Sequence, residues 1–310
     1  MRWPMRSEAR KPRNGRNGSL SPLISLPPGA ARDPREVFLV LPGLNLPPEK
    51  MTSLRECLLA GGHAVANPPL FGISPPDPAD WEAVRAEEWL ADLDRAGASI
   101  AAAHPEASLS LLGYSLGALL GMTWSLARGR PFRRAILLSP AFGLKGYAPP
   151  ALAALVALLP GRLRLPSAGP APYRLHQGTT LAAYRALLEL MRRFRAETAK
   201  LEQPGAALPL QFIAFSPRDE LISLRSLRRY YSLATSRLTL YTLGHDRRPG
   251  FPFHLGIDEE TLGAAEWNAL REALGEWLKG RPERATGAEP TLPAGRASST
   301  AAGRAAQGRP

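Results

Sequence analysis

One pentapeptide constrains this chain more than any other stretch. Residues Gly113-Tyr114-Ser115-Leu116-Gly117 fit the pattern G-x-S-x-G. The apolar run 109–112 before it is typical of a buried parallel strand, and the residues after it keep helical spacing. The pattern therefore predicts a strand, a very tight turn and a helix. Gly113 and Gly117 have no Cβ, so strand and helix can approach closely while the Ser115 hydroxyl stands clear of the backbone.

A serine in such a turn is a candidate nucleophile. The helix that begins at Ser115 directs backbone N–H groups and the positive end of its dipole toward a reacting carbonyl. The pentapeptide alone also fits a glycine-rich turn with a structural serine, but the flanking strand and helix favour the catalytic interpretation. That interpretation requires an acid, a histidine and an oxyanion hole elsewhere in the chain.

Composition sets the broad class. A chain of 310 residues suffices for one large α/β domain with appended segments. Cys57 is the single cysteine, which excludes an intrachain disulfide and favours a cytoplasmic location. The net charge is +12, but residues 1–36 and 281–310 together hold eight of those charges. We therefore interpret the charge as solvated tails and expect no nucleic-acid partner.

The composition also predicts the domain boundaries. Residues 1–34 form a basic, Pro- and Gly-rich arm and residues 281–310 lack periodicity, so both are expected to be disordered. The folded domain is expected over 35–280. No apolar run of about 18 residues occurs, so no transmembrane helix is expected.

Strands and helices alternate along the folded part. Strands are expected over 36–41, 63–67, 109–112, 135–139, 210–215 and 238–242. Helices are expected over 49–60, 80–103, 116–128, 221–233 and 261–279. This alternation predicts an α/β fold with a mostly parallel central sheet and helices on both faces.

Residues 143–207 interrupt the alternation. They contain apolar helical runs over 149–159 and 179–201 and no evident strand. We expect a helical insertion, or cap, packed over the carboxyl edge of the sheet, where α/β folds bind ligands. The apolar composition of the run 149–159 favours a lipophilic substrate and leaves peripheral membrane contact through the cap open.

Taken together, these motifs resemble the α/β-hydrolase superfamily, and within it the carboxylesterase and monoacylglycerol-lipase-like enzymes with a helical cap. The resemblance spans residues 36–279. It rests on a strand ending in Pro42-Gly43, the elbow at Ser115, an aspartate after a late strand and a histidine before the last helix. The order Ser, Asp, His is that of the superfamily.

The resemblance implies that Asp219 is the acid. The segment Phe215–Ser223 follows a strand, precedes a helix and is similar to the family's D-E-x-I/V segment. A carboxylate there accepts the Nδ1–H of the catalytic histidine and stabilises the imidazolium. Asp219 also suits the N-cap of the following helix. Its neighbour Glu220 is the rival carboxylate, but the family pattern places the role on the first of the two.

The resemblance favours His254 as the base, with His245 as the alternative. The segment that begins at His254, H-L-G-I-D, is similar to the family's H-V-I-x-x-D and has its spacing to the last helix. His245 follows the last strand in a Gly-His pair, another form that this site takes. The chain's other histidines are His63 and His104, which precede Ser115, and His176, which lies in the expected cap.

The oxyanion hole is assigned to two backbone N–H groups. One belongs to Leu116, next to the nucleophile. The other belongs to Leu44, in the loop where the family has His-Gly-x and this chain has Pro42-Gly43-Leu44. Because the donor is a backbone N–H, the replacement of the family's histidine by Pro42 does not remove it. The chain contains no H-E-x-x-H or C-x-x-C motif for a metal and no G-x-x-x-x-G-K-S/T motif for a nucleotide. No metal and no cofactor are therefore expected.

These residues together imply a serine hydrolase that cleaves small lipophilic carboxylic esters through an acyl-enzyme. The same triad would serve an acyltransferase, a thioesterase or an amidase. A catalytically inactive fold that acts as a binding protein is the alternative from another class. The natural substrate and the oligomeric state are not specified by these patterns.

Overall fold

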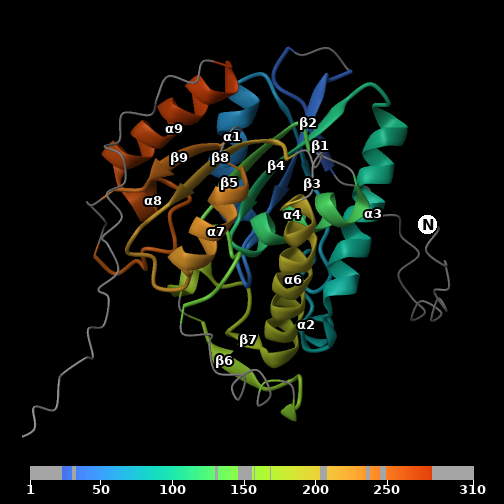
Figure 1. The fold of residues 1–310 in the computed structure, drawn as a ribbon, viewed down its shortest axis with the longest axis vertical. Coiled ribbons are helices and arrows are strands. Elements are labelled where there is room, and N and C mark those ends of the chain that lie inside the picture. Colours follow the sequence, from blue (N-terminus) through green and yellow to red (C-terminus); the bar gives the residue numbers. More distant parts are fainter. Residues whose placement is uncertain are drawn as a thin grey trace, which may run out of the picture.

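The computed structural model describes residues 23–29, 33–129, 132–145, 156, 158–167, 169–202, 208–234, 238–244 and 249–280. Seven strands form one sheet in the order β1-β3-β2-β4-β5-β8-β9 (Figure 1). They are β1 (Leu23–Ser25), β2 (Glu36–Leu41), β3 (Ala64–Asn67), β4 (Ser108–Tyr114), β5 (Arg134–Leu138), β8 (Leu210–Phe215) and β9 (Leu238–Thr242). All neighbours are parallel except β1, which is antiparallel to β3. The predicted mostly parallel sheet is confirmed.

Helices cover both faces of the sheet, as predicted. They are α1 (Thr52–Ala60), α2 (Pro78–Ala83), α3 (Ala86–Ala103), α4 (Leu116–Arg128), α6 (Leu181–Ala199), α7 (Leu224–Ala234), α8 (Glu259–Leu262) and α9 (Ala264–Leu278). Along β2, Val37 and Leu39 join the apolar layer formed with α3, α4, α6 and α7. Phe38 and Val40 join the opposite layer, formed with α1 and α9. Every residue of β2 is buried, which is typical of a parallel strand covered on both sides.

The single helix predicted over 80–103 is wrong, because the structure has α2 and α3 there. The two residues between these helices have extended backbone angles. A new helix start forms at Arg85, whose backbone N–H donates to the Glu88 carboxylate at 2.9 Å, as in a capping box. The last predicted helix is likewise divided, into α8 and α9, at Gly263, where φ is 81° and a Cβ would be strained.

An edge strand lies inside the segment predicted to be a disordered arm. The prediction of disorder for 1–34 is wrong at residues 23–25, which form β1 and pair along their whole length with β3. A strand this short carries no readable periodicity, and it is held by the backbone groups at the otherwise open edge of β3. Residues 1–22 and 281–310 lie outside the described residues.

The segment predicted to form the cap, residues 143–207, contains strands that the sequence did not indicate. β6 (Arg164–Pro166) and β7 (Gly178–Thr180) form a two-stranded antiparallel sheet. Three residues per strand are too few for an alternating pattern to show. Helix α6 follows β7 and packs on α4, α2 and α3, so much of it extends the helical layer rather than covering the strand ends (Figure 1). Most of the predicted helical run 149–159 lies outside the described residues.

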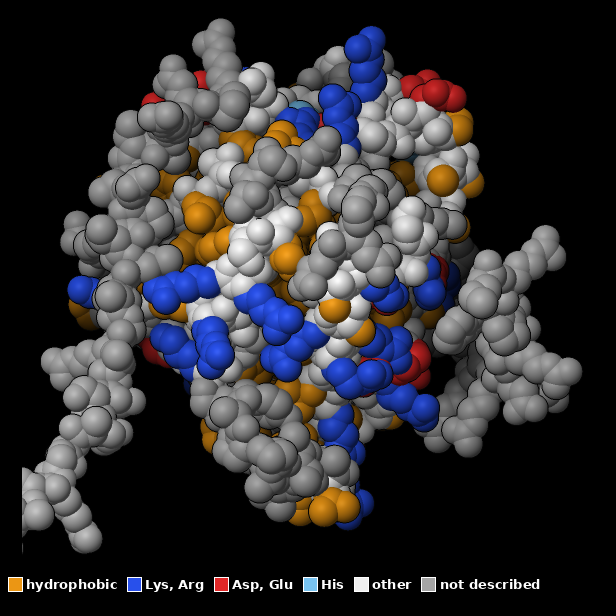
Figure 2. All heavy atoms as spheres, in the orientation of Figure 1, with side chains coloured by type: hydrophobic (Ala, Val, Ile, Leu, Met, Phe, Trp, Pro, Cys, Tyr) orange, Lys and Arg blue, Asp and Glu red, His pale blue; other side chains and the backbone are white. Residues whose placement is uncertain are grey.

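Basic side chains gather on the face that carries α6 and α7 (Figure 2). Arg195, Arg225 and Arg228 are exposed there, while Phe194 and Leu227 on the same two helices are buried. This division is typical of amphipathic helices that turn a basic face to solvent. Within the described part of the chain, no helix is both long and apolar enough to cross a membrane.

Asp92 is a buried carboxylate that ties α3 to the loop between β3 and α2. It accepts the backbone N–H of Phe71 at 2.7 Å and pairs with Arg95. Burial raises the pKa of Asp92 from 3.8 to about 6, although the Phe71 N–H and Arg95 oppose that shift. The folded protein therefore binds a proton at Asp92 more tightly than the unfolded chain does.

Replacing Asp92 with asparagine is expected to change how stability depends on pH. In the wild type, the Asp92 contribution favours folding most below the unfolded pKa of 3.8 and is lost as the pH rises to about 6. The loss is on the order of 3 kcal/mol. Asparagine still accepts from Phe71 but binds no proton. Urea unfolding on both sides of this window should show Asp92→Asn gaining stability relative to wild type as the pH rises. A constant difference would contradict this.

Candidate active site

The ends of four strands place the predicted site residues at one edge of the sheet. β2, β4, β8 and β9 are parallel, so the loops that follow them leave from their carboxyl ends at that edge. The loop after β2 carries Leu44, Ser115 follows β4, and Asp219 follows β8. His254 lies in the segment between β9 and α8. Ligand sites of α/β folds form at this edge.

The turn between β4 and α4 is strained and tightly packed. Ser115 has φ 51° and ψ −110°, a conformation that non-glycine residues rarely adopt. A Cβ on Gly113 would lie 2.5 Å from the backbone nitrogen of Ala118. A Cβ on Gly117 would lie 2.1 Å from the backbone oxygen of Leu41. Both glycines are therefore required by the close approach of α4 to the sheet, which holds the Ser115 side chain clear of the chain.

Gly117→Ala is expected to destabilise the fold by about 3 kcal/mol or more, because the added Cβ meets backbone that cannot move aside. Gly275→Ala in α9 is the matched control, since nothing lies within 4 Å of its Cβ position. Alanine in a helix interior stabilises by up to about 1 kcal/mol relative to glycine. Denaturant unfolding of the two variants measures both effects. Equal stabilities would contradict the packing described for the turn.

Three polar side chains meet at the sheet edge. His254 Nε2 lies 2.9 Å from Ser115 Oγ, and His254 Nδ1 lies 2.8 Å from Asp219 Oδ2. All three residues are buried, and Asp219 is only 1% exposed. With Nδ1–H donating to Asp219, the neutral ring leaves Nε2 free to accept the Ser115 proton. The arrangement can therefore deprotonate Ser115 and return the proton to a leaving group.

Asp219 is held as an ionised group. Its Oδ1 accepts the backbone N–H groups of Leu221 at 2.8 Å and Ile222 at 2.9 Å, so Oδ2 is available to His254. Burial opposes ionisation, but the hydrogen bond from His254, the positive charge of that ring when it is protonated, and those two N–H groups keep the pKa of Asp219 below its usual value. The carboxylate thus orders its own loop and orients the histidine.

Two further residues hold the backbone of His254, and the sequence analysis gave neither this role. The Tyr114 hydroxyl donates to the backbone oxygen of His254 at 3.2 Å. The Glu220 carboxylate accepts the N–H groups of Phe253 at 2.9 Å and His254 at 3.1 Å. Glu220 was the rival acid, and its position beside Asp219 was the available signal. Asp219 therefore orients the ring of His254, and the next residue, Glu220, holds its main chain.

The remaining histidines take other places. His63 precedes β3 and His104 follows α3, so both lie at the amino edge of the sheet, opposite Ser115. His176 lies in the segment predicted to form the cap, and its Nε2 is 3.0 Å from a backbone oxygen of the β3–α2 loop. His245, the alternative base, lies outside the described residues. Among the described histidines, His254 alone has a hydrogen bond to Ser115.

The loop after β2 lies against the serine. A Cβ on Gly43 would be 3.4 Å from Ser115 Cβ. The Leu46 N–H donates to the Gly43 oxygen at 3.2 Å, which closes a turn with Leu44 and Asn45 at its centre. Asn45 has φ 59°, as turns with a left-handed third residue require. Leu116 begins α4, where N–H groups have no acceptor within the helix.

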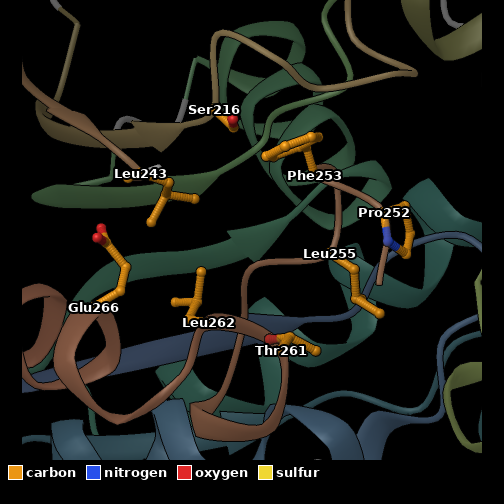
Figure 3. Close-up of a pocket in the computed structure, with 9 residues that line it drawn as sticks. Ser216, Leu243, Pro252, Phe253, Leu255, Thr261, Leu262 and Glu266 are labelled. Atoms are coloured by element: carbon orange, nitrogen blue, oxygen red, sulfur yellow. The ribbon is translucent and has the colours of Figure 1, made fainter. Parts of the chain in front are cut away.

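A separate pocket lies behind the His254 segment. Figure 3 shows the side chains of Phe253 and Leu255 from that segment, with those of Leu243, Leu262 and Glu266, around the same hollow. Ser115 does not line it, so it is not where a substrate carbonyl would meet the serine. Among the described residues, no cluster of His, Cys, Asp or Glu is arranged to hold a metal ion.

Comparison with known proteins gives a family match and fold relatives. The profile of the serine aminopeptidase (S33) family matches residues 32–171, which include β2 and the elbow but neither Asp219 nor His254. No curated protein matches the chain.

Three solved structures illustrate the likeness of fold. One is from work on the metagenome-derived lipolytic enzymes LipS and LipT, at 20% identity, with a TM-score of 0.60 and coverage of 85% of this chain and 98% of that one. The second is a soluble variant of monoglyceride lipase from Saccharomyces cerevisiae, at 14% identity, with a TM-score of 0.62 and coverage of 84% of this chain and 91% of that one. The third is monoacylglycerol lipase from Paleococcus ferrophilus, at 17% identity, with a TM-score of 0.62 and coverage of 84% of this chain and 100% of that one. At these identities the likeness concerns the fold.

Proposed function

We propose that this chain, which has the α/β-hydrolase fold shared by esterases and lipases, is a serine hydrolase that cleaves carboxylic esters. The observation that supports this most is the pair of hydrogen bonds from Ser115 through His254 to Asp219. A serine with φ 51° at the start of a helix adds to it. Geometry of this kind activates a hydroxyl that is otherwise a weak nucleophile.

In the proposed reaction, Ser115 Oγ attacks the ester carbonyl carbon while His254 Nε2 takes its proton. His254 then gives that proton to the departing alcohol oxygen, and the acyl group remains on Ser115. A water molecule, deprotonated by His254, attacks the acyl carbon, and Ser115 Oγ leaves with the proton. Asp219 stays ionised throughout and stabilises the imidazolium that forms in each half.

The oxyanion hole is assigned to the backbone N–H groups of Leu44 and Leu116. The packing of Gly43 against Ser115 brings the loop after β2 next to the nucleophile. Leu116 is the first residue of α4, so its N–H lies beside the positive end of the helix dipole. Loss of one such donor typically costs about 10²- to 10³-fold in turnover.

A lipophilic substrate is the class that the cap favours. Leu158 is 84% exposed, and Leu163 and Leu165 beside or within β6 are also exposed. Figure 2 shows hydrophobic side chains at the end of the molecule where β6 lies. Apolar surface on a cap suits an acyl chain or a lipid interface. We propose a short- to medium-chain ester or a monoacylglycerol as substrate, with peripheral membrane contact through the cap.

A panel of matched substrates tests this proposal. It contains p-nitrophenyl esters from acetate to decanoate, a thioester and an anilide of the same acyl group, and a monoacylglycerol. We expect a higher kcat/KM for the esters than for the anilide or the thioester, and hydrolysis rather than transfer when glycerol is added. Preferred cleavage of the anilide or thioester, or acylated glycerol as the main product, would overturn the assignment of the reaction.

A further inference from the structure

A short cap segment, residues 173–176, contacts the loop after β2. Asn45 Nδ2 donates to the backbone oxygen of His176 at 3.0 Å, and the His176 N–H donates back to Asn45 Oδ1 at 2.8 Å. The Leu175 N–H donates to the Asn45 backbone oxygen at 2.9 Å. Asn45 is almost fully buried. These bonds hold the residue next to Leu44 in its left-handed conformation, which otherwise costs free energy for a residue with a Cβ.

The same cap segment contacts the segment that carries His254. The Tyr173 hydroxyl is 2.7 Å from Asp258 Oδ2 and 2.8 Å from Glu260 Oε2. Asp258 caps α8 by accepting the Thr261 N–H at 2.9 Å. Burial and the two carboxylates raise the pKa of Tyr173, so the phenol keeps its proton. Lys50 lies 3.5 Å from Glu260 Oε2 and offsets part of the negative charge.

The cap segment is itself anchored on a third side. The His176 ring stacks on Trp81 with centroids 5.1 Å apart, and its Nε2 is 3.0 Å from the Gly72 oxygen. Phe71, next to Gly72, is tied to α3 through Asp92. Because residues 173–176 are fixed in this way, they can restrain the loop after β2 and the His254 segment, which both contact them.

We propose that residues 173–176 form a strap that holds the oxyanion loop and the His254 segment in register, with Asn45 and Tyr173 as positioning residues. The proposal rests on the proposed function, since it assigns the strap to the same site. It differs from a lid, because a lid acts on the bound substrate whereas the strap acts on the enzyme's own loops. Its loss should therefore lower turnover of every ester by a similar factor.

Two substitutions test the strap. Asn45→Gly permits the left-handed backbone but removes both side-chain hydrogen bonds, and Tyr173→Phe removes only the hydroxyl. We expect kcat to fall about 10- to 100-fold for Asn45→Gly, through misplacement of an oxyanion donor, and less for Tyr173→Phe. KM should change little, and the factor should be the same for an acetate and a decanoate ester. Asn45→Asp keeps the acceptor for the His176 N–H but sets a carboxylate oxygen, which cannot donate, against the His176 carbonyl oxygen, so it should not restore the loss.

Thr180→Val is the matched control for a weakened cap. Thr180 is buried in the predicted cap segment, and its hydroxyl donates to the Trp81 backbone oxygen at 2.7 Å and accepts the Ala183 N–H at 3.2 Å, so these hydrogen bonds involve neither loop of the site. Thr180→Val should lower the melting temperature while leaving kcat unchanged.

Unchanged kcat in Asn45→Gly and Tyr173→Phe, or a loss of activity confined to the long ester, would overturn the proposal that residues 173–176 position the site. If Asn45→Gly does not fold, Tyr173→Phe decides. Full activity in Ser115→Ala would overturn the proposed function instead.

Discussion

Replacing Ser115 with alanine is expected to lower kcat by about 10⁶-fold, as removal of a nucleophile from a serine hydrolase does. The variant should fold, because the hydroxyl is the only group lost and its partner His254 keeps the bond to Asp219. Hydrolysis of a p-nitrophenyl ester, followed with enough enzyme to detect a single turnover, measures the loss.

Ser139→Ala is the matched control for that result. Ser139 also follows a strand, has a positive φ of 41° and is buried. Its Oγ makes no hydrogen bond among the described residues. Its substitution should leave kcat within a few-fold of wild type. Similar activity losses in the two variants would show that disturbance of the sheet edge, and not a nucleophile, explains the first.

The second large effect is expected at His254. His254→Ala should reduce kcat about as much as Ser115→Ala, because the members of the proposed triad are expected to act as a unit. His245→Ala should retain most of the activity, since His254 already occupies the position between Ser115 and Asp219. Measuring kcat for both variants on one ester distinguishes the two histidines. The reverse result, with His245 essential and His254 dispensable, would contradict the assigned base.

Local signals in the sequence were enough for the six mutually parallel strands of the central sheet and for the turn at Ser115. The strands and the two glycines of the elbow follow from apolar runs and from the need for close approach, which operate over a few residues. The break at Arg85 was missed because helical spacing continues across it, and a side-chain cap starts the second helix. β1 was missed because three residues pair through backbone groups alone.

The candidate site shows the same limit at longer range. The resemblance to the hydrolase superfamily implied Asp219 and His254, but the contact between them depends on where the sheet brings two distant loops. Contacts such as Asn45 with His176, separated by 131 positions, have no sequence signature. Glu220 is adjacent to Asp219 in the sequence. Its hydrogen bond with the His254 backbone N–H, however, forms only because folding brings two separate loops together.

Covalent labelling tests the central claim most directly. A fluorophosphonate should add once per chain, and peptide mass mapping should place the adduct on the peptide that contains Ser115. Labelling should abolish ester hydrolysis in proportion to its extent, and it should be absent in Ser115→Ala. An adduct on another residue, or equal labelling of the wild type and Ser115→Ala, would contradict Ser115 as the nucleophile.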